Sequence, residues 1–332
     1  WDEAWEQKAY TQWAYLEDYK AAVKTLLDFT EQVSAHTRAA EFLLDAALVA
    51  ERDGDLDQAV QLFEKVINVY PDYEKAQRSL FLAGITSYRN ADYQRALLIF
   101  LRYQGMAAAL EDRSAAAFWL GKVQLAVGDH ETALDTWEGA AAIDPTGYYS
   151  ERARDLLHDR LPFEPPGSYD LAFDLQSERQ RAEEWLRTTF QLSPDEDLSG
   201  LGALAADPGM ARGKELWELG LYTEARAEFE AVRLAVANDA ALTYRLTNYL
   251  LDLGLYRSAI QAARQVLALA YLDGAATLNA PAYFNHVRFG VYFRELIMPL
   301  SGQYNFHPLF LFALVRQESL FEGFVSSTAG AR

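Results

Sequence analysis

The chain contains no cysteine, which excludes disulfide bonds and thiolate metal sites without identifying a cellular compartment. It has no run of eighteen apolar residues, so no segment is expected to cross a membrane as a helix. Its five histidines are scattered, and no His-Glu-x-x-His pair is present to hold zinc. We therefore expect neither a bound metal nor another cofactor.

Basic residues are also scarce. The net charge is −18, and residues 281–332 carry four Arg against three Glu, so the acidic excess belongs to residues 1–280. Because nucleic-acid binding depends on Lys and Arg that neutralise phosphates, we expect no nucleic-acid partner. The acidic residues are expected to keep a large helical surface soluble.

Residues 1–280 show no convincing strand alternation, but they carry a repeat. It consists of a small turn residue, an Ala five positions later and, in most copies, an aromatic residue four positions after that Ala. The steps are 37 residues among the first three copies and 34 residues between the last two. The copies begin at Gly54, Ala91, Gly128, Gly220 and Gly254.

Each position of the repeat has a mechanical explanation. The small residue forms the turn between two antiparallel helices, the Ala lets these helices approach, and the aromatic ring fills the groove toward the next unit. Gly84, Gly121 and Gly213 lie seven residues before their turns and are expected to be the matching small contacts on the first helix. The pattern resembles the tetratricopeptide repeat, which implies that residues 1–280 stack into a superhelical solenoid.

The last segment carries the one carboxylate with a recognisable chemical role. Leu311, Leu314 and Val315 have the spacing of one apolar helix face. Glu318 continues this series, so its side chain is expected on the buried side, where loss of hydration favours the neutral form. A general acid needs this property. The structural alternative is a Glu at a helix end that turns to water or pairs with Arg316.

The residues after Glu318 follow a recognisable order, namely Ser319, Phe321, Ser327 and Ala329-Gly330-Ala331. This order closely resembles the signature of the soluble lytic transglycosylases, and residues 292–317 resemble the lead into that family's catalytic Glu. In the family the run continues into Gly-Leu-Met-Gln. Because Arg332 lies one position before that continuation, the resemblance implies only the beginning of a catalytic domain, which is expected to be inactive by itself.

The resemblance implies an all-α protein, with a tetratricopeptide-like superhelix over residues 1–280 and the first helices of a goose-type lysozyme-like domain over residues 281–332. It implies a lyase that cleaves the β-1,4 bond between N-acetylmuramic acid and N-acetylglucosamine in peptidoglycan. Glu318 would protonate the glycosidic oxygen and then deprotonate the muramic 6-hydroxyl, which closes a 1,6-anhydro ring. Ser319 and Ser327 would contact the substrate. Their structural alternatives are a polar residue at a helix end and a loop serine.

The partners implied by the resemblance are peptidoglycan glycan strands and other cell-wall proteins. The implied location is the periplasm or cell envelope, with any export signal removed before Trp1. A second hypothesis requires no catalysis. In it, the chain is a repeat scaffold that binds a protein partner and carries a vestigial lytic segment.

Overall fold

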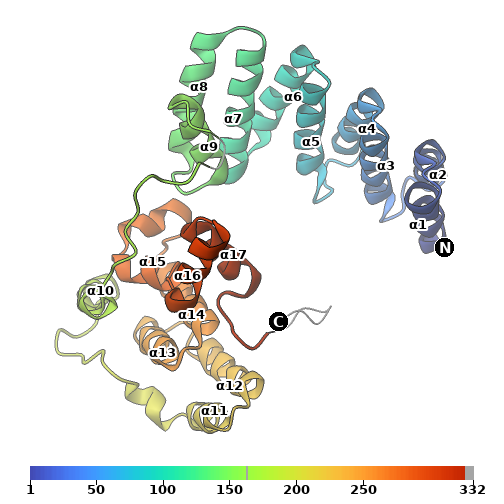
Figure 1. Cartoon of the computed structure of the whole chain (residues 1–332). Coiled ribbons are helices and arrows are strands. Elements are labelled where there is room, and N and C mark those ends of the chain that lie inside the picture. Colours follow the sequence, from blue (N-terminus) through green and yellow to red (C-terminus); the bar gives the residue numbers. More distant parts are fainter. Residues whose placement is uncertain (162–163, 326–332) are drawn as a thin grey trace. The chain divides into compact units, whose positions relative to one another are not determined.

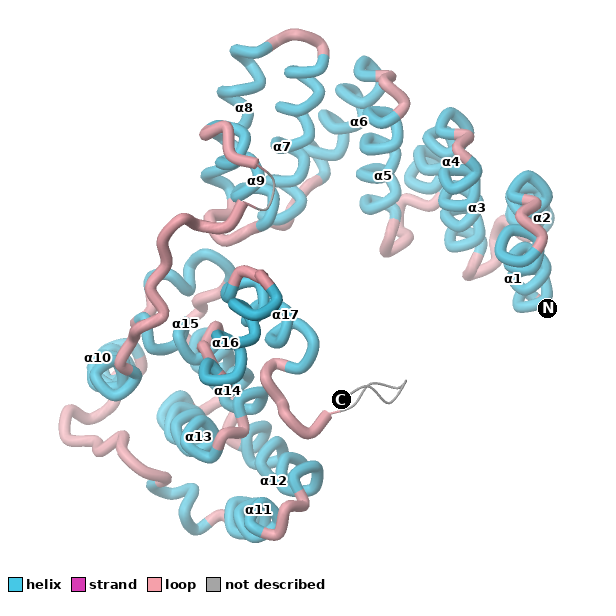
Figure 2. Tube along the Cα trace, in the orientation of Figure 1, coloured by secondary structure: helices cyan, strands magenta, loops and turns pink. Residues whose placement is uncertain are grey.

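The computed structural model describes residues 1–161 and 164–325, and the chain divides into two compact units, Trp1–Glu164 and Pro165–Arg332. Every regular element in the described residues is a helix (Figure 2). The expected all-α class is therefore confirmed. Along the same residues, no helix combines the length and the apolar composition needed to cross a bilayer.

The first unit is a row of antiparallel helices, each packed against the next along the chain (Figure 1). Its elements are α1 (Asp2–Tyr10), the π-helical turn η1 (Thr11–Tyr15), α2 (Tyr19–Gln32), α3 (Ala39–Asp53), α4 (Leu56–Val69), α5 (Ala76–Arg89), α6 (Tyr93–Met106), α7 (Leu110–Ala126), α8 (His130–Ile143) and α9 (Tyr148–Leu157).

The second unit contains two further hairpins of this kind, α11–α12 and α13–α14, together with three helices that follow them. Its elements are α10 (Leu175–Thr189), the 3-10 helix η2 (Gly202–Ala206), α11 (Pro208–Glu218), α12 (Tyr222–Ala235), α13 (Ala240–Leu253), α14 (Tyr256–Leu269), the 3-10 helix η3 (Gly274–Asn279), α15 (Ala282–Arg288), α16 (Arg294–Tyr304) and α17 (Pro308–Ser319).

The turns between paired helices follow the repeat. Gly54 and Gly128 adopt left-handed backbone angles, with φ of +85° and +89°, which a residue without Cβ accepts at little cost. Ala91 occupies the same position in the α5–α6 hairpin with φ of +59°. In the first unit the next residue is an Asp whose side chain caps the second helix. Asp55 illustrates this, because its Oδ1 accepts the backbone N–H of Gln58 at 3.0 Å.

Three glycines lie against aromatic rings within their own hairpins, and the pairs are Gly84 with Phe100, Gly121 with Trp137 and Gly213 with Phe229. A Cβ on Gly84 would lie 2.7 Å from the ring of Phe100. The expectation that these glycines are small contacts on the first helix is confirmed. The Phe100 ring also stacks on Trp119 of α7, with 5.8 Å between centroids, so it fills space toward the next unit as well.

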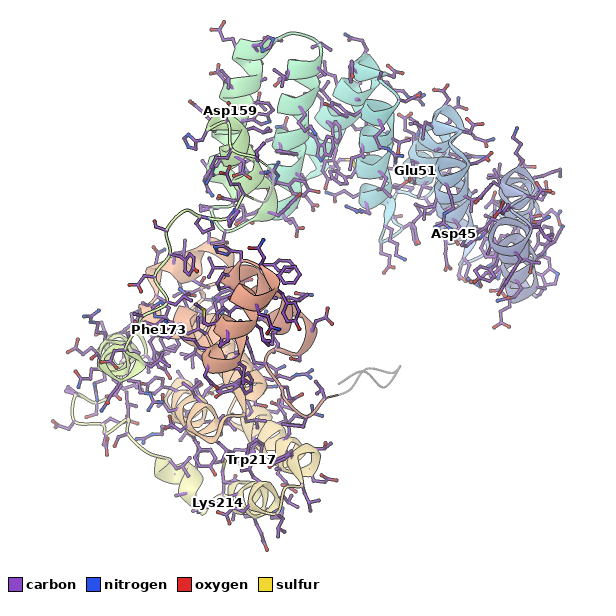
Figure 3. The ribbon with its side chains drawn as sticks, in the orientation of Figure 1. Asp45, Glu51, Asp159, Phe173, Lys214 and Trp217 are labelled. Carbon is purple, nitrogen blue, oxygen red and sulfur yellow. The ribbon has the colours of Figure 1, made fainter. Side chains whose placement is uncertain are left out.

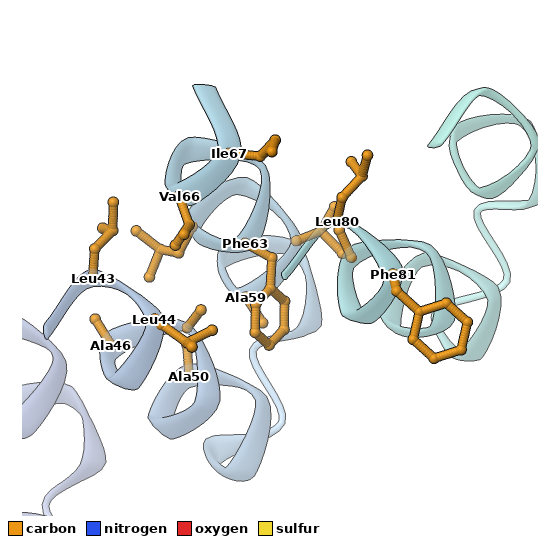
Figure 4. Close-up of a cluster of buried hydrophobic side chains, with 14 of the residues drawn as sticks. Leu43, Leu44, Ala46, Ala50, Ala59, Phe63, Val66, Ile67, Leu80 and Phe81 are labelled. Carbon is orange, nitrogen blue, oxygen red and sulfur yellow. The ribbon is translucent and has the colours of Figure 1, made fainter. Parts of the chain in front are cut away.

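In the α13–α14 hairpin the larger side chain stands at the position of the small residue, and a small one stands at the position of the ring. Thr247 stands where other hairpins have Gly or Ala, and Ala263 stands where they have a ring, and both residues are fully buried. In the middle of the first unit, Figure 4 shows how side chains from three successive helices fill the core, including Leu43, Phe63 and Leu80. Burying each such side chain contributes roughly 1.5–3 kcal/mol.

Residues after 280 belong to the core of the second unit. Tyr283, Phe284 and Phe312 share one buried cluster with Tyr244 and Leu250 of α13. This arrangement does not show the lysozyme-like domain expected over residues 281–332. The structure separates its two units after Glu164, and a functional boundary after residue 280 stays a prediction.

Candidate functional site

The structure places Glu318 near the end of α17 with its side chain exposed. The buried residue of α17 is Phe312, and at 3.6 residues per turn a residue six positions later lies well away from that face. The expected burial of Glu318 is wrong, because the buried face centres on Phe312 and leaves Leu314 exposed. Ser319 donates its hydroxyl to the carbonyl oxygen of Val315 at 3.2 Å, within its own helix. Ser327 lies outside the described residues.

The residues that follow Glu318 anchor the end of the described chain. Phe321 is 2% exposed, and its ring lies 5.2 Å from that of Tyr292. The carboxylate of Glu322 is buried between two arginines, with Oε2 accepting from Arg226 Nη1 at 2.7 Å and from Arg257 Nη1 at 3.2 Å. The ring of Phe324 continues this packing against α11 and α12. This segment therefore has a clear structural role.

A cavity of about 440 Å³ opens between α1 and α3 in the first unit. Its walls include aromatic side chains at the end of α1 and in η1, and aliphatic and charged side chains from α3. The residues that line it include Glu6, Tyr10, Trp13, Asp45, Leu48 and Arg52. The rings of Tyr10 and Trp13 meet edge to face with 5.2 Å between centroids. The volume lies in the range of known ligand pockets.

Asp45 is the unusual residue of this cavity. It lies on α3, where Figure 3 labels it, and its carboxylate forms no hydrogen bond or ion pair with the residues that the structure describes. Burial raises the pKa of Asp45 to about 6, and the negative charges of Glu41 and Glu6 add to this rise. Perturbed carboxylates in concave sites are candidates for function.

The neighbouring acids are neutralised by another residue. Arg38 donates from Nη2 to Glu6 at 2.8 Å, from Nε to Glu41 at 2.8 Å and from Nη1 to Asp2 at 3.1 Å. These hydrogen bonds lower the pKa of Glu41 and of Asp2. Three carboxylates thus share one guanidinium, and Asp45 adds a fourth negative charge to the same patch.

Arg52, which lies seven residues after Asp45 on α3, does not pair with the Asp45 carboxylate. Arg52 lies over the ring of Trp13, with its Cζ 4.3 Å from the ring centroid. A guanidinium at this distance gains a cation–π interaction. The cavity therefore combines an unpaired carboxylate with an aromatic wall that already accommodates one cation.

Two stretches of the chain match family models of the tetratricopeptide repeat. The first covers residues 41–73, which include most of α3 and α4, and the second covers residues 210–270, which run from α11 to α14. Asp45, Leu48 and Arg52 lie within the first of these tetratricopeptide repeats. The expected repeats and helical solenoid are confirmed.

The chain is also similar to a solved tetratricopeptide repeat protein from Parabacteroides merdae. The two share 13% sequence identity, the match covers 86% of this chain and 98% of that chain, and the TM-score is 0.37. No curated protein matches the chain in sequence.

The resemblance to soluble lytic transglycosylases is contradicted by these matches. The matching family models are those of the tetratricopeptide repeat, and no model of a catalytic family matches. The prediction of a lyase is therefore wrong, whereas the individual roles predicted for Glu318, Ser319 and Ser327 stay predictions. The similarity is confined to a short segment in which aromatic and acidic residues serve packing, as Phe321 and Glu322 show. A location in the cell envelope stays a prediction.

Asp45 was not predicted as a functional residue, although the sequence around it is unusual. Residues 42–50 read Phe-Leu-Leu-Asp-Ala-Ala-Leu-Val-Ala, and Asp45 is the one polar residue in this run. A lone acid in an apolar helix segment calls for a partner or a function. In the described residues no group of His, Asp and Glu side chains is arranged to hold a metal ion. The expectation that the chain uses no cofactor stays a prediction.

Proposed function

We propose that the chain is a scaffold that binds a protein partner, and that the cavity between α1 and α3 receives a basic side chain of this partner. The tetratricopeptide matches support the general role as a binding protein. The observation that supports this particular cavity is the partly buried carboxylate of Asp45, which has no partner among the described residues.

The energetic cost of Asp45 supports a binding role. An ionised carboxylate that loses hydration without gaining a hydrogen bond or ion pair destabilises the folded state. Asparagine at the same position would avoid this cost. A Lys or Arg from a partner would supply the missing counter-charge, so part of the binding free energy would come from relief of this penalty.

The surroundings favour a cation over an anion. Glu6, Glu41 and Asp2 share the guanidinium of Arg38, and Asp45 adds a fourth negative charge. The other cations near the site are Lys75 and Arg52, so the local charge remains negative. Tyr10 is 42% exposed and Leu48 is 40% exposed at the edge of the cavity. Such apolar surface would contact the aliphatic part of a lysine or arginine side chain.

The test uses the full chain as bait for a library of random linear peptides. We expect enrichment of peptides that contain Lys or Arg, and a selected peptide should bind Asp45→Asn at least tenfold more weakly, since charge-assisted hydrogen bonds contribute about 1.5–3 kcal/mol. Asp53→Asn is the matched control, because Asp53 is exposed at the end of the same helix. Equal loss of affinity in both variants would contradict the role of Asp45.

A further inference from the structure

Several described arginines of the second unit form no ion pair with a carboxylate. Three of them are Arg264 on α14, Arg288 at the end of α15 and Arg316 on α17. The ion pairs of this unit within the described residues involve other side chains. Unpaired arginines are unexpected in a chain with a net charge of −18, because acidic partners are abundant.

Arg288 and Arg316 are held together by the fold, and Arg264 lines the same cavity as Arg288. Arg316 donates from Nε to the carbonyl oxygen of Arg288 at 2.8 Å. Both guanidinium groups lie on the ring of Phe289, with Cζ 4.4 Å from its centroid for Arg316 and 5.2 Å for Arg288. Arg288 also donates from Nη1 to Asn285 at 3.1 Å, but its Nε is buried without a hydrogen-bond partner.

This arrangement opposes like charges at close range. Burial lowers the pKa of Arg288, the positive charges of Arg264 and Arg316 lower it further, and the negative charge of Asp273 opposes this shift only in part. Burial and the charge of Arg264 also lower the pKa of Arg316. An anion bound beside these groups would relieve their repulsion.

A cavity of about 690 Å³ lies beside the cluster. Arg264 and Arg288 line it, with Arg233 and the amides of Gln261 and Gln265. Arg233 already has a partner, because it donates to Glu230 at 2.7 Å. The carboxylate of Asp273 also lines the cavity, accepts the backbone N–H of Gly274 at 2.8 Å and keeps a negative charge that acts on Arg288. Arg264 and Arg288 are the cations that remain for a ligand.

We propose that this cavity binds a phosphoryl group, with Arg264 and Arg288 as the residues that contact it. A phosphate monoester carries close to two negative charges near neutral pH and presents three acceptor oxygens. Planar guanidinium groups donate in pairs to such oxygens, and several arginines can share one phosphoryl group. A single carboxylate would offset less of the positive charge. The phosphoryl group can belong to a small phosphorylated molecule or to a phosphorylated side chain of a partner.

The test is calorimetric titration of the full chain at constant ionic strength with inorganic pyrophosphate, with a blocked phosphoserine derivative and with citrate. We expect saturable binding of at least one phosphorylated probe, and weaker binding of citrate. Tighter binding of pyrophosphate than of the phosphoserine derivative would identify a small phosphorylated molecule as the source, and the reverse order would identify a phosphorylated side chain. Equal or tighter binding of citrate would overturn the assignment to phosphoryl groups.

The variants separate binding from folding. Arg264→Gln and Arg288→Gln should each lower the affinity about tenfold or more, because each removes charge-assisted hydrogen bonds. Arg181→Gln, at an exposed position on α10, should bind like the natural sequence. Without an anion, Arg264→Gln should melt no lower than the natural chain, since it relieves repulsion. Pyrophosphate should raise the melting temperature of the natural chain more than that of Arg264→Gln. Absence of saturable binding, or unchanged affinity in both arginine variants, would refute the site.

Discussion

Replacing Gly121 by Ala tests the packing inside one hairpin. A Cβ at this position would overlap the indole of Trp137 on the facing helix α8. The indole cannot move freely, because its Nε1 donates to the carbonyl oxygen of Phe118 at 3.0 Å and the side chain is 3% exposed. The added methyl group must therefore displace a buried ring.

Three contributions determine how much Gly121→Ala changes the free energy of unfolding. Overpacking of a filled core costs about 1–3 kcal/mol. Loss of the indole hydrogen bond adds about 1 kcal/mol. The higher helix propensity of Ala offsets about 1 kcal/mol of this loss. We expect Gly121→Ala to destabilise the first unit by about 1–3 kcal/mol.

Gly139→Ala is the matched control in the same hairpin. Gly139 lies on an exposed side of α8, and a Cβ there would meet no atom within 4 Å. The control should therefore stabilise the hairpin by about 1 kcal/mol through helix propensity alone. Hydrogen exchange measured by mass spectrometry on peptides of α7 and α8, in the full chain, reports both changes locally. Stabilisation of comparable size in both variants would refute the proposed contact between Gly121 and Trp137.

Three further predictions concern other positions. Asp45→Asn should raise stability at about pH 7.5 by roughly 1–3 kcal/mol, because the ionised carboxylate is poorly solvated. Between pH 3.8 and about 6, the Asp45 carboxyl group of the natural chain binds its proton more tightly in the folded state than in the unfolded state. The stability of the natural chain therefore falls as pH rises through that window. The benefit of Asn should then vanish below the window in urea titrations, and a pH-independent benefit would contradict this assignment. Ala91→Gly should stabilise by about 1 kcal/mol, since Ala91 has φ of +59° where Gly54 has +85°, and Gly54→Ala should have the opposite effect. Both changes are measurable by chemical denaturation, and equal signs would contradict the turn assignment. Glu322→Gln should lower the free energy of unfolding by about 2–4 kcal/mol, because it leaves two arginines without their shared carboxylate. Glu318→Gln, at an exposed position, should change the stability measured by thermal unfolding by less than about 0.5 kcal/mol. A similar effect of both changes would contradict the anchoring role of Glu322.

The repeat was predictable because its residues act locally. A small turn residue, an Ala and a ring at fixed spacing determine how two consecutive helices pack, and the spacing is visible in the sequence. The three Gly and ring pairs were found for this reason. The helix-capping role of Asp55 was equally local and was nevertheless missed, although Asp before a helix is a common cap.

The end of the chain was less predictable, because its side chains contact distant residues. Glu322 pairs with Arg226 across 96 positions, and no local pattern shows such a contact. The apolar face of α17 was assigned from Leu311, Leu314 and Val315, whereas the structure buries Phe312, half-buries Leu311 and Val315 and leaves Leu314 exposed. This difference moves Glu318 from a buried to an exposed position and removes the physical basis for a general acid there.

The cavity around Asp45 was also only partly predictable from the sequence. The run from Phe42 to Ala50 marks Asp45 as unusual, but the lack of a partner depends on how Arg38 distributes its hydrogen bonds among Asp2, Glu6 and Glu41. Two of these acids come from α1, which is far away in sequence. The charge balance of the cavity therefore emerges only once α1 packs near α3.

The most direct test of the proposed scaffold is the pH dependence of its affinity for a selected basic peptide, measured by fluorescence anisotropy for the natural chain and for Asp45→Asn. We predict that the affinity of the natural chain falls as pH decreases through about 6, because Asp45 becomes neutral, and that the variant binds weakly with a flat profile. Equal affinities and parallel pH profiles for the two proteins would contradict the claim that Asp45 receives the basic side chain of a partner.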